Sequence, residues 1–344
     1  MFKNRVLPTL ILLGLIVACT LAPALPERTP VQVASTATAT PVTPAATPTE
    51  RRPTPTPSAA PAPTPTPAEP VFFGSWQMLR RTKAPSLAYA AGFLDAEFGI
   101  TVGHQGDTRY TRDGGQTWER GESRSLCGQG LDIVDEQIAW YCGAPWTGYG
   151  SKGFVRLSAD GGQTWQPVTG YGPPHPKHCR FLSLLDAQTG WAATPYQIGM
   201  TADGGETWTD LPLPEGIADI AAIALRTAAD GYLLDVEGTI YLTQDAGQTW
   251  STHRLGREGG KRLSTGSQPT AALRFHDADR GIAILQDTHH LWTAHTTNGG
   301  QTWQWEEIPG VPTRCTLYLA RDGETLTLFD GAEIIVLRYR GTAQ

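Results

Sequence analysis

The stretch Thr111-Arg-Asp113-Gly-Gly-Gln-Thr-Trp118 decides the fold, because the same phrase occurs five times in the chain. The other copies are Ser158-Ala-Asp160-Gly-Gly-Gln-Thr-Trp165, Thr201-Ala-Asp203-Gly-Gly-Glu-Thr-Trp208, Thr243-Gln-Asp245-Ala-Gly-Gln-Thr-Trp250 and Thr296-Thr-Asn298-Gly-Gly-Gln-Thr-Trp303. Their Asp or Asn positions follow one another at intervals of 47, 43, 42 and 53 residues, which fits the period of a four-stranded propeller blade. The sequence therefore predicts an all-β repeat protein.

Each copy has the chemistry of a hairpin turn. The third residue offers oxygen atoms to backbone N–H groups of the turn, the paired glycines adopt positive φ without strain, and the tryptophan begins the next strand. Asn298 keeps the acceptor oxygen and Ala246 replaces one glycine, and we expect the turn to survive both changes. Their regular spacing indicates structural rather than catalytic roles for Asp113, Trp118, Asp160, Trp165, Asp203, Trp208, Asp245, Trp250, Asn298 and Trp303.

Further strands are expected around these turns. Residues 92–103, 184–193 and 275–284 each read as an apolar strand, a polar turn and a second strand, which is the inner hairpin of a blade. Residues 315–340 form a last unit with only three expected strands, and residues 76–80 can supply the fourth. The prediction is a six-bladed β-propeller that is closed by pairing the two ends of its domain, which leaves no long sheet edge open.

The N-terminal part has a different composition. Lys3 and Arg5 precede an apolar run over residues 6–18, the pattern of a secretory signal that is too short to span a bilayer. Residues 20–70 hold 14 of the 27 prolines and no glycine or aromatic residue, so we expect a disordered, extended Pro/Thr-rich linker. The folded domain is therefore expected over residues 71–344.

Charge and histidine spacing exclude two kinds of partner. Residues 71–344 carry 22 basic and 30 acidic side chains, a net charge of −8, which opposes binding to a phosphate backbone and argues against nucleic acid. His289, His290 and His295 have no carboxylate or cysteine at metal-ligand spacing. We expect neither a metal site nor a cofactor.

The end of the apolar run resembles a known processing signal. Ile16-Val-Ala-Cys19 is similar to the lipobox of bacterial lipoproteins, which implies removal of residues 1–18 and lipidation of Cys19 at the head of residues 19–70. The implied location is outside the cell, anchored to the outer face of a bacterial cell membrane, or to an outer membrane if present. The alternative is an ordinary signal with an incidental cysteine.

The five turns resemble those of the Asp-box, or bacterial neuraminidase repeat, β-propellers. That family places the turn between the third and fourth strands of a blade, away from the binding face. Asp186-Ala-Gln-Thr-Gly-Trp191 together with the copy at residues 201–208 is similar to the photosystem II stability and assembly factor family. This resemblance implies a non-enzymatic propeller that binds membrane-protein partners, although members of that family usually have seven blades.

Sialidases also have Asp-boxes, and they supply the alternative function. Their chemistry needs three converging arginines, a tyrosine activated by a glutamate, and an acid/base aspartate. The chain lacks the Arg-Ile-Pro phrase that normally provides the first arginine, since Arg80 and Arg81 are followed by Thr82-Lys-Ala-Pro85. We therefore expect a protein-binding scaffold rather than an enzyme, with a glycan-binding or sialidase-like propeller as the alternative.

Three loops on the face opposite the boxes are the candidate binding surface. One carries two aromatic residues that can cover a sugar or a protein, one is stiffened by prolines, and one concentrates cations on an acidic domain. Their candidate binding residues are Trp146, Tyr149, His175, Lys177, Arg254, Arg257, Lys261 and Arg262.

Four cysteines remain after Cys19, and in an exported chain they permit three disulfide pairings. Cys127 and Cys142 flank the expected inner hairpin of blade two, so they can face each other across adjacent strands. Cys179 and Cys315 begin the inner strands of blades three and six, too far apart for a disulfide. The sequence predicts one bond, between Cys127 and Cys142.

Overall fold

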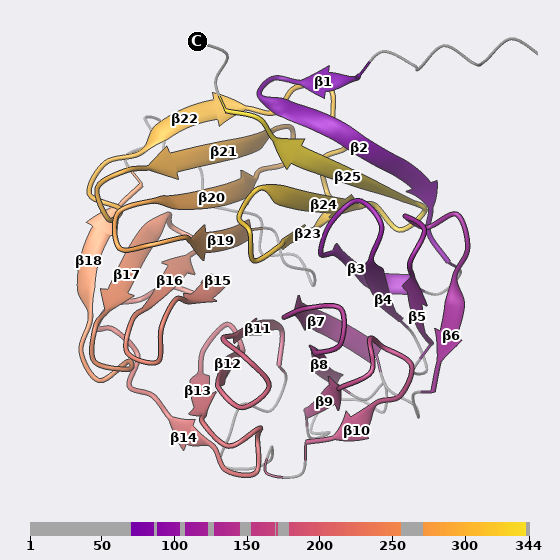
Figure 1. Cartoon of the computed structure of the whole chain (residues 1–344). Helices are drawn as coiled ribbons and strands as arrows, with labels where there is room; N and C mark the ends of the chain where they lie inside the picture. The colour runs from indigo at the N-terminus through magenta and orange to yellow at the C-terminus, as the bar shows by residue number, and fades with distance from the viewer. Residues whose placement is uncertain are drawn as a thin grey trace, which may run out of the picture. The chain divides into compact units, whose positions relative to one another are not determined.

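The computed structural model describes residues 70–85, 88–103, 107–122, 127–144, 153–168, 170, 179–255 and 271–341. These residues form six antiparallel sheets around a central axis (Figure 1), which is the predicted six-bladed propeller. Within these ranges the secondary structure consists of strands, and there is no helix that could cross a lipid bilayer. The signal sequence, Cys19 and the linker lie outside the described residues.

Five blades are continuous in sequence, and each contains four strands in chain order from the centre outward. Blade one consists of β3 (Ala88–Phe93), β4 (Gly99–Gly103), β5 (Thr108–Thr111) and β6 (Glu119–Gly121). Blade two consists of β7 (Cys127–Ile133), β8 (Ala139–Ala144), β9 (Phe154–Ser158) and β10 (Gln166–Pro167). Blade three consists of β11 (Phe181–Leu184), β12 (Gly190–Ala193), β13 (Ile198–Thr201) and β14 (Thr209–Asp210).

The next two blades follow the same plan. Blade four consists of β15 (Ile220–Leu225), β16 (Gly231–Asp235), β17 (Thr239–Thr243) and β18 (Ser251–Arg254). Blade five consists of β19 (Ala271–Phe275), β20 (Gly281–Gln286), β21 (Leu291–Thr296) and β22 (Gln304–Glu307). In all five blades the repeated turn lies between the third and fourth strands, as the resemblance to Asp-box propellers implies.

The sixth blade closes the ring with strands from both ends of the domain. Its inner strands are β23 (Thr316–Leu319), β24 (Thr325–Phe329) and β25 (Glu333–Tyr339). The N-terminal strands β2 (Trp76–Lys83) and β1 (Phe72–Phe73) complete the sheet. β2 pairs antiparallel with β25 from Trp76↔Tyr339 to Lys83↔Glu333, which confirms the predicted closure and leaves no open end between the first and last blades (Figure 1).

The strand directions define two faces of the ring. Each inner strand ends at the face that carries the repeated turns, which we call the box face. The opposite face carries the connections between second and third strands and between blades, and we call it the loop face. Apolar side chains fill the space between neighbouring blades, where Trp76, Trp140 and Trp191 are fully buried.

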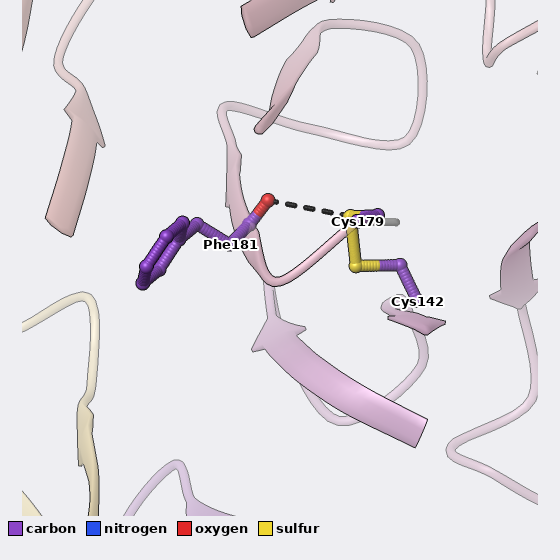
Figure 2. The surroundings of a disulfide bond; sticks show 3 residues. All are labelled: Cys142, Cys179 and Phe181. Atoms are coloured by element: carbon purple, nitrogen blue, oxygen red, sulfur yellow. Dashed lines mark hydrogen bonds between the residues drawn. A yellow bond between two sulfur atoms is a disulfide. The ribbon is translucent and has the colours of Figure 1, made fainter. Parts of the chain in front are cut away.

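The predicted disulfide is wrong, because Cys142 is bonded to Cys179 and not to Cys127. Gly130 pairs with Cys142 in the same register as Leu131↔Tyr141, and Cys127 pairs with Ala144 beyond a bulge between Gly128 and Gly130. Cys179 directly precedes β11 of the neighbouring blade, with its Cα 5.6 Å from that of Cys142. The bond therefore connects blades two and three, next to Phe181 (Figure 2). Cys315 is buried and free.

Candidate binding sites at the two mouths of the central channel

The box carboxylates are occupied within their own turns. Asp113 accepts hydrogen bonds from the Thr117 amide at 3.0 Å, from the Thr117 hydroxyl at 2.6 Å and from the Thr111 hydroxyl at 2.8 Å. The corresponding hydroxyl and amide bonds form at Asp160, Asp203 and Asp245. All four carboxylates are therefore acceptors within the scaffold.

These contacts also keep the box carboxylates ionised. Hydrogen bonds from the threonine hydroxyl and then from the backbone amide four residues on lower the pKa of Asp113, Asp203 and Asp245 to about 2. At Asp160 burial opposes the charge, but hydrogen bonds from Thr164 and Ser158 outweigh it and the pKa is lowered. None of the four is suited to donate a proton near neutral pH.

The box tryptophans each pack against an aromatic ring near the inner strands of a blade. The pairs and their ring-centroid distances are Trp118–Phe93 at 6.0 Å, Trp165–Tyr141 at 4.7 Å, Trp208–Trp140 at 6.4 Å, Trp250–Trp191 at 6.0 Å and Trp303–Phe275 at 6.0 Å. The turn and its tryptophan thus stabilise the blade and contribute no reactive group.

Most of the predicted binding residues lie outside the described part of the chain. These are Trp146, Tyr149, His175, Lys177, Arg257, Lys261 and Arg262. Arg254 is described and exposed, at the end of β18 opposite Thr239. The binding surface that the sequence predicts from these eight loop residues therefore stays a prediction.

Two residues that the sequence did not single out lie at the loop face. Tyr196, in the β12–β13 connection, is 67% exposed, the highest value of the three exposed large apolar side chains among the described residues. Arg180 precedes β11 and lines a channel segment of about 70 Å³ together with Gln129. Burial lowers the pKa of Arg180, while the nearby Tyr196 and Asp219 act in the opposite direction.

A buried polar network closes the middle of the channel. Arg274 donates to Asp132 Oδ1 at 2.5 Å, to Ser183 Oγ at 3.0 Å and to the Leu319 carbonyl at 3.2 Å. The Leu225 amide donates to Ser183 Oγ at 2.8 Å. These residues belong to β7, β11, β15, β19 and β23, so the network joins the inner strands of five blades. Asp132 is completely buried, and Arg274 pairs with it across the channel.

A basic mouth opens beyond this network at the box face. A cavity of about 240 Å³ is lined by Arg226, Arg274, His276 and Arg321, at the ends of the inner strands of blades four, five and six. Arg226 donates to Asp230 at 2.5 Å, but its buried Nε has no partner among the described residues. Arg321 donates to the Leu184 carbonyl at 3.1 Å. These donors suit a carboxylate or another small anion.

The residues that line the basic mouth supply arginines but not the other groups of a sialidase. No tyrosine, aspartate or glutamate is among the residues that line the cavity. The described part of the chain does contain a Tyr–Glu hydrogen bond, from Tyr110 to Glu119 at 2.8 Å, but it lies on β5 and β6 of blade one. The lining of the cavity can therefore bind an anion, and Asp230 and Tyr232 form hydrogen bonds to its Arg226.

Sequence reasoning missed the basic mouth, because its arginines are isolated in the chain. A signal was nevertheless present: Arg226, Arg274 and Arg321 each lie within two residues of the end of an expected inner strand. In the described ranges, no three His, Cys, Asp or Glu side chains are grouped so that they could hold a metal ion.

Two family models match segments of the propeller. The family model described as photosynthesis system II assembly factor YCF48 matches residues 131–267, which span blades two to four. The BNR/Asp-box repeat model matches residues 109–120, the first box. The chain is thus an Asp-box β-propeller with a YCF48-like segment. No curated protein matches the sequence.

Three solved structures are similar to the chain at low identity. The structure titled "YCF48 bound to D1 peptide" is 20% identical with a TM-score of 0.47, covering 79% of this chain and 98% of that one. YCF48 from Cyanidioschyzon merolae is 16% identical with a TM-score of 0.46, covering 77% and 98%. U3-55K is 9% identical with a TM-score of 0.50, covering 76% and 98%, a likeness of fold alone.

Proposed function

We propose that this propeller is a non-enzymatic scaffold that binds a protein partner during assembly of a membrane complex. The observation that carries the proposal is the match of blades two to four to the YCF48 assembly-factor model. The boxes support it, because their carboxylates are occupied by turn hydrogen bonds and are not available for acid or base chemistry.

The basic mouth is our candidate for one contact with the partner. On a domain of net charge −8, Arg226, Arg274 and Arg321 gather three guanidinium groups around one cavity. A carboxylate that enters the cavity can accept from the guanidinium groups of Arg226 and Arg321, which line it. An acidic side chain or a chain terminus of a protein partner meets this requirement. The loop face, with Tyr196 and the predicted loop residues, is the candidate for a second contact.

We further propose that the scaffold works at a membrane surface. The lipobox-like Ile16-Val-Ala-Cys19 supports export and lipidation of Cys19, and residues 20–70 are long enough to hold the head away from the lipid. Mass spectrometry of the purified N-terminal peptide tests this: a diacylglyceryl group on Cys19 is expected. A soluble protein with an unmodified Cys19 contradicts it.

The test of the function is cross-linking of the native protein in its own membranes, followed by capture and mass spectrometry. We expect a reproducible membrane complex that is lost in Arg321→Gln. Arg280→Gln is the matched control, because Arg280 is an exposed arginine of the same face that pairs with Asp277 away from the cavity. If both variants lose the complex equally, the basic mouth is not the contact.

A second result decides between the function classes. If capture recovers only bulk membrane protein from all variants, the assembly proposal fails. The soluble head is then assayed for glycan binding and for release of sugars, which are the properties of the alternative class. Trp146→Ala, in the same capture experiment, tests whether the loop face takes part.

A further inference from the structure

Asn298 differs from the aspartates of the other four boxes in its chemical reactivity as well as in its charge. The chain has two asparagines, Asn4 and Asn298, and only Asn298 is followed by glycine. An Asn–Gly pair is prone to cyclise, because glycine has no Cβ to keep its backbone nitrogen away from the preceding side-chain amide. The fifth box therefore holds the one sequence in the chain that is primed for spontaneous deamidation.

In the closed turn, hydrogen bonds occupy both reacting groups, the side-chain amide of Asn298 and the backbone nitrogen of Gly299. Asn298 Oδ1 accepts from the Thr302 amide at 2.9 Å and from the Thr296 hydroxyl at 3.0 Å, and its Nδ2 donates to Thr302 Oγ1 at 2.9 Å. The attacking nitrogen is also occupied, because Gly299 N–H donates to the Asp279 carbonyl at 2.8 Å. Cyclisation requires that these four bonds be broken and that the side chain turn toward Gly299.

We propose that Asn298 is a latent deamidation site, silent while the fifth box is closed and reactive when the β21–β22 hairpin opens. In the reaction the Gly299 nitrogen forms a bond to Asn298 Cγ, the bond from Cγ to Nδ2 breaks, and the leaving nitrogen departs as ammonia with the Gly299 amide proton. Water then opens the cyclic imide at either carbonyl and gives aspartate or isoaspartate.

The fold distinguishes the two products. Aspartate at 298 reproduces the acceptor of the other four boxes, in which the threonine hydroxyl donates to the carboxylate, as Thr117 does to Asp113. Isoaspartate places an additional carbon in the main chain, so the bond from Gly299 N–H to Asp279 can no longer form in register. One product is compatible with the closed turn, and the other leaves blade five open at its edge.

The position of the hairpin explains how the reaction can begin. β22 is the outermost strand of blade five and pairs only with β21, and Gln304 and Glu307 at its ends are exposed. Edge hairpins of this kind open locally at a smaller free energy than that of global unfolding. The rate of deamidation then measures the open fraction of this one hairpin.

The full-length protein is incubated at mildly alkaline pH, both native and in urea, and residue 298 is followed by peptide mapping with an isoaspartate-specific label. We expect rapid conversion in urea and slow conversion in the native protein. Thr302→Ala removes the bond to Nδ2 and should raise the native rate about tenfold. Thr207→Ala, the same change in the third box, is the matched control and should leave the rate at 298 unchanged.

Two results would overturn the proposal. Equal rates in the native and urea-treated protein would show that the turn gives no protection, and no conversion of residue 298 in urea would show that the site is not reactive. If Thr302→Ala does not fold, the comparison of native with urea-treated wild-type protein still tests the proposal. Asn298→Asp should fold with at least the wild-type urea midpoint, whereas purified isoaspartyl protein should unfold at lower urea.

Discussion

At the scale of single residues, Ala246 shows how far the box tolerates a departure from its pattern. Ala246 takes the place of the first box glycine and adopts a φ of +59°, close to the +68° to +73° of the equivalent glycines in the other boxes. A left-handed conformation is unfavourable for an L-residue with a Cβ. The fourth box keeps its hydrogen bonds, so the turn does not rearrange to relieve the strain at Ala246.

Replacement of this alanine by glycine should therefore stabilise the domain. We expect Ala246→Gly to raise the free energy of unfolding by about 0.5–1 kcal/mol, the left-handed strain less the greater chain entropy of glycine. Urea unfolding at pH 7 measures the change. Ala278→Gly, at a turn residue without positive φ, should give no gain. A lower urea midpoint for Ala246→Gly would contradict the prediction.

His295 makes the stability of blade five dependent on pH. Its ring stacks on Tyr339 with centroids 4.3 Å apart, and burial lowers its pKa to about 4, although Glu306 acts in the opposite direction. The unfolded state therefore binds a proton more readily than the folded state. The contribution of neutral His295 is complete above pH 6.5 and is lost as the pH falls toward 4.

Between pH 7.5 and pH 5 this linkage should lower the free energy of unfolding by up to about 2 kcal/mol. The comparison is between the wild type and His295→Gln, which has no titrating ring and should lose less stability over the same interval. His289→Gln, at an exposed histidine, should keep the wild-type pH profile. The explanation fails if His295→Gln and the wild type change in parallel.

At the scale of elements, the repeats made most of the fold predictable. The five box phrases and their spacing predict the blades because each turn is local, and the unmatched strands at residues 76–80 and 315–340 predict closure because an open ring has two exposed edges. The disulfide was not predictable in this way. The register of the β7–β8 hairpin places Gly130 and not Cys127 opposite Cys142, and no turn motif marks that register.

The binding sites were less predictable than the fold. The basic mouth depends on residues of blades four, five and six that meet only after the ring closes, so spacing along the chain does not bring Arg226, Arg274 and Arg321 to attention. The partner of Arg274 is likewise in a distant blade, at Asp132. The roles of the box carboxylates were predictable because their hydrogen-bond partners lie within four residues of them.

The disulfide between blades two and three gives a prediction at this scale. Cys142 and Cys179 are separated by 37 residues, and removal of their bond should lower the free energy of unfolding by about 2–4 kcal/mol, mainly by freeing the unfolded chain. Cys142→Ser and Cys179→Ser should show this loss in urea. Cys127→Ser should retain the linked peptide in a non-reducing map, and its absence there would favour the pairing that the sequence suggested.

At the scale of the whole molecule, the closing blade controls the stability of the ring. Trp76 of β2 is completely buried, and its ring lies 5.4 Å from that of Tyr339 on β25. Because β2 and β25 come from opposite ends of the domain, their contact within blade six is the one that closes the ring. Loss of packing at this contact should lower the stability of all the blades, because a cooperative domain unfolds as one unit.

Trp76→Ala should lower the free energy of unfolding by about 3–5 kcal/mol. Tryptophan fluorescence and circular dichroism should still report a single coincident transition. Trp303→Ala, which removes a half-buried ring within one blade, should have a smaller effect. An early separate transition in Trp76→Ala, with the rest of the ring intact, would show that closure is not required for the other blades.

The path of the chain into the closing blade also has a mechanical consequence. Tension applied from the N-terminal side enters the domain at β1, which pairs with β2 through only two residues. That short pair separates one bond after another under low force, and the load then passes to β2 and the long β2–β25 pair. The joint that completes the ring is therefore the first long strand pair to bear a pull from the N-terminal side, and its rupture would open the ring.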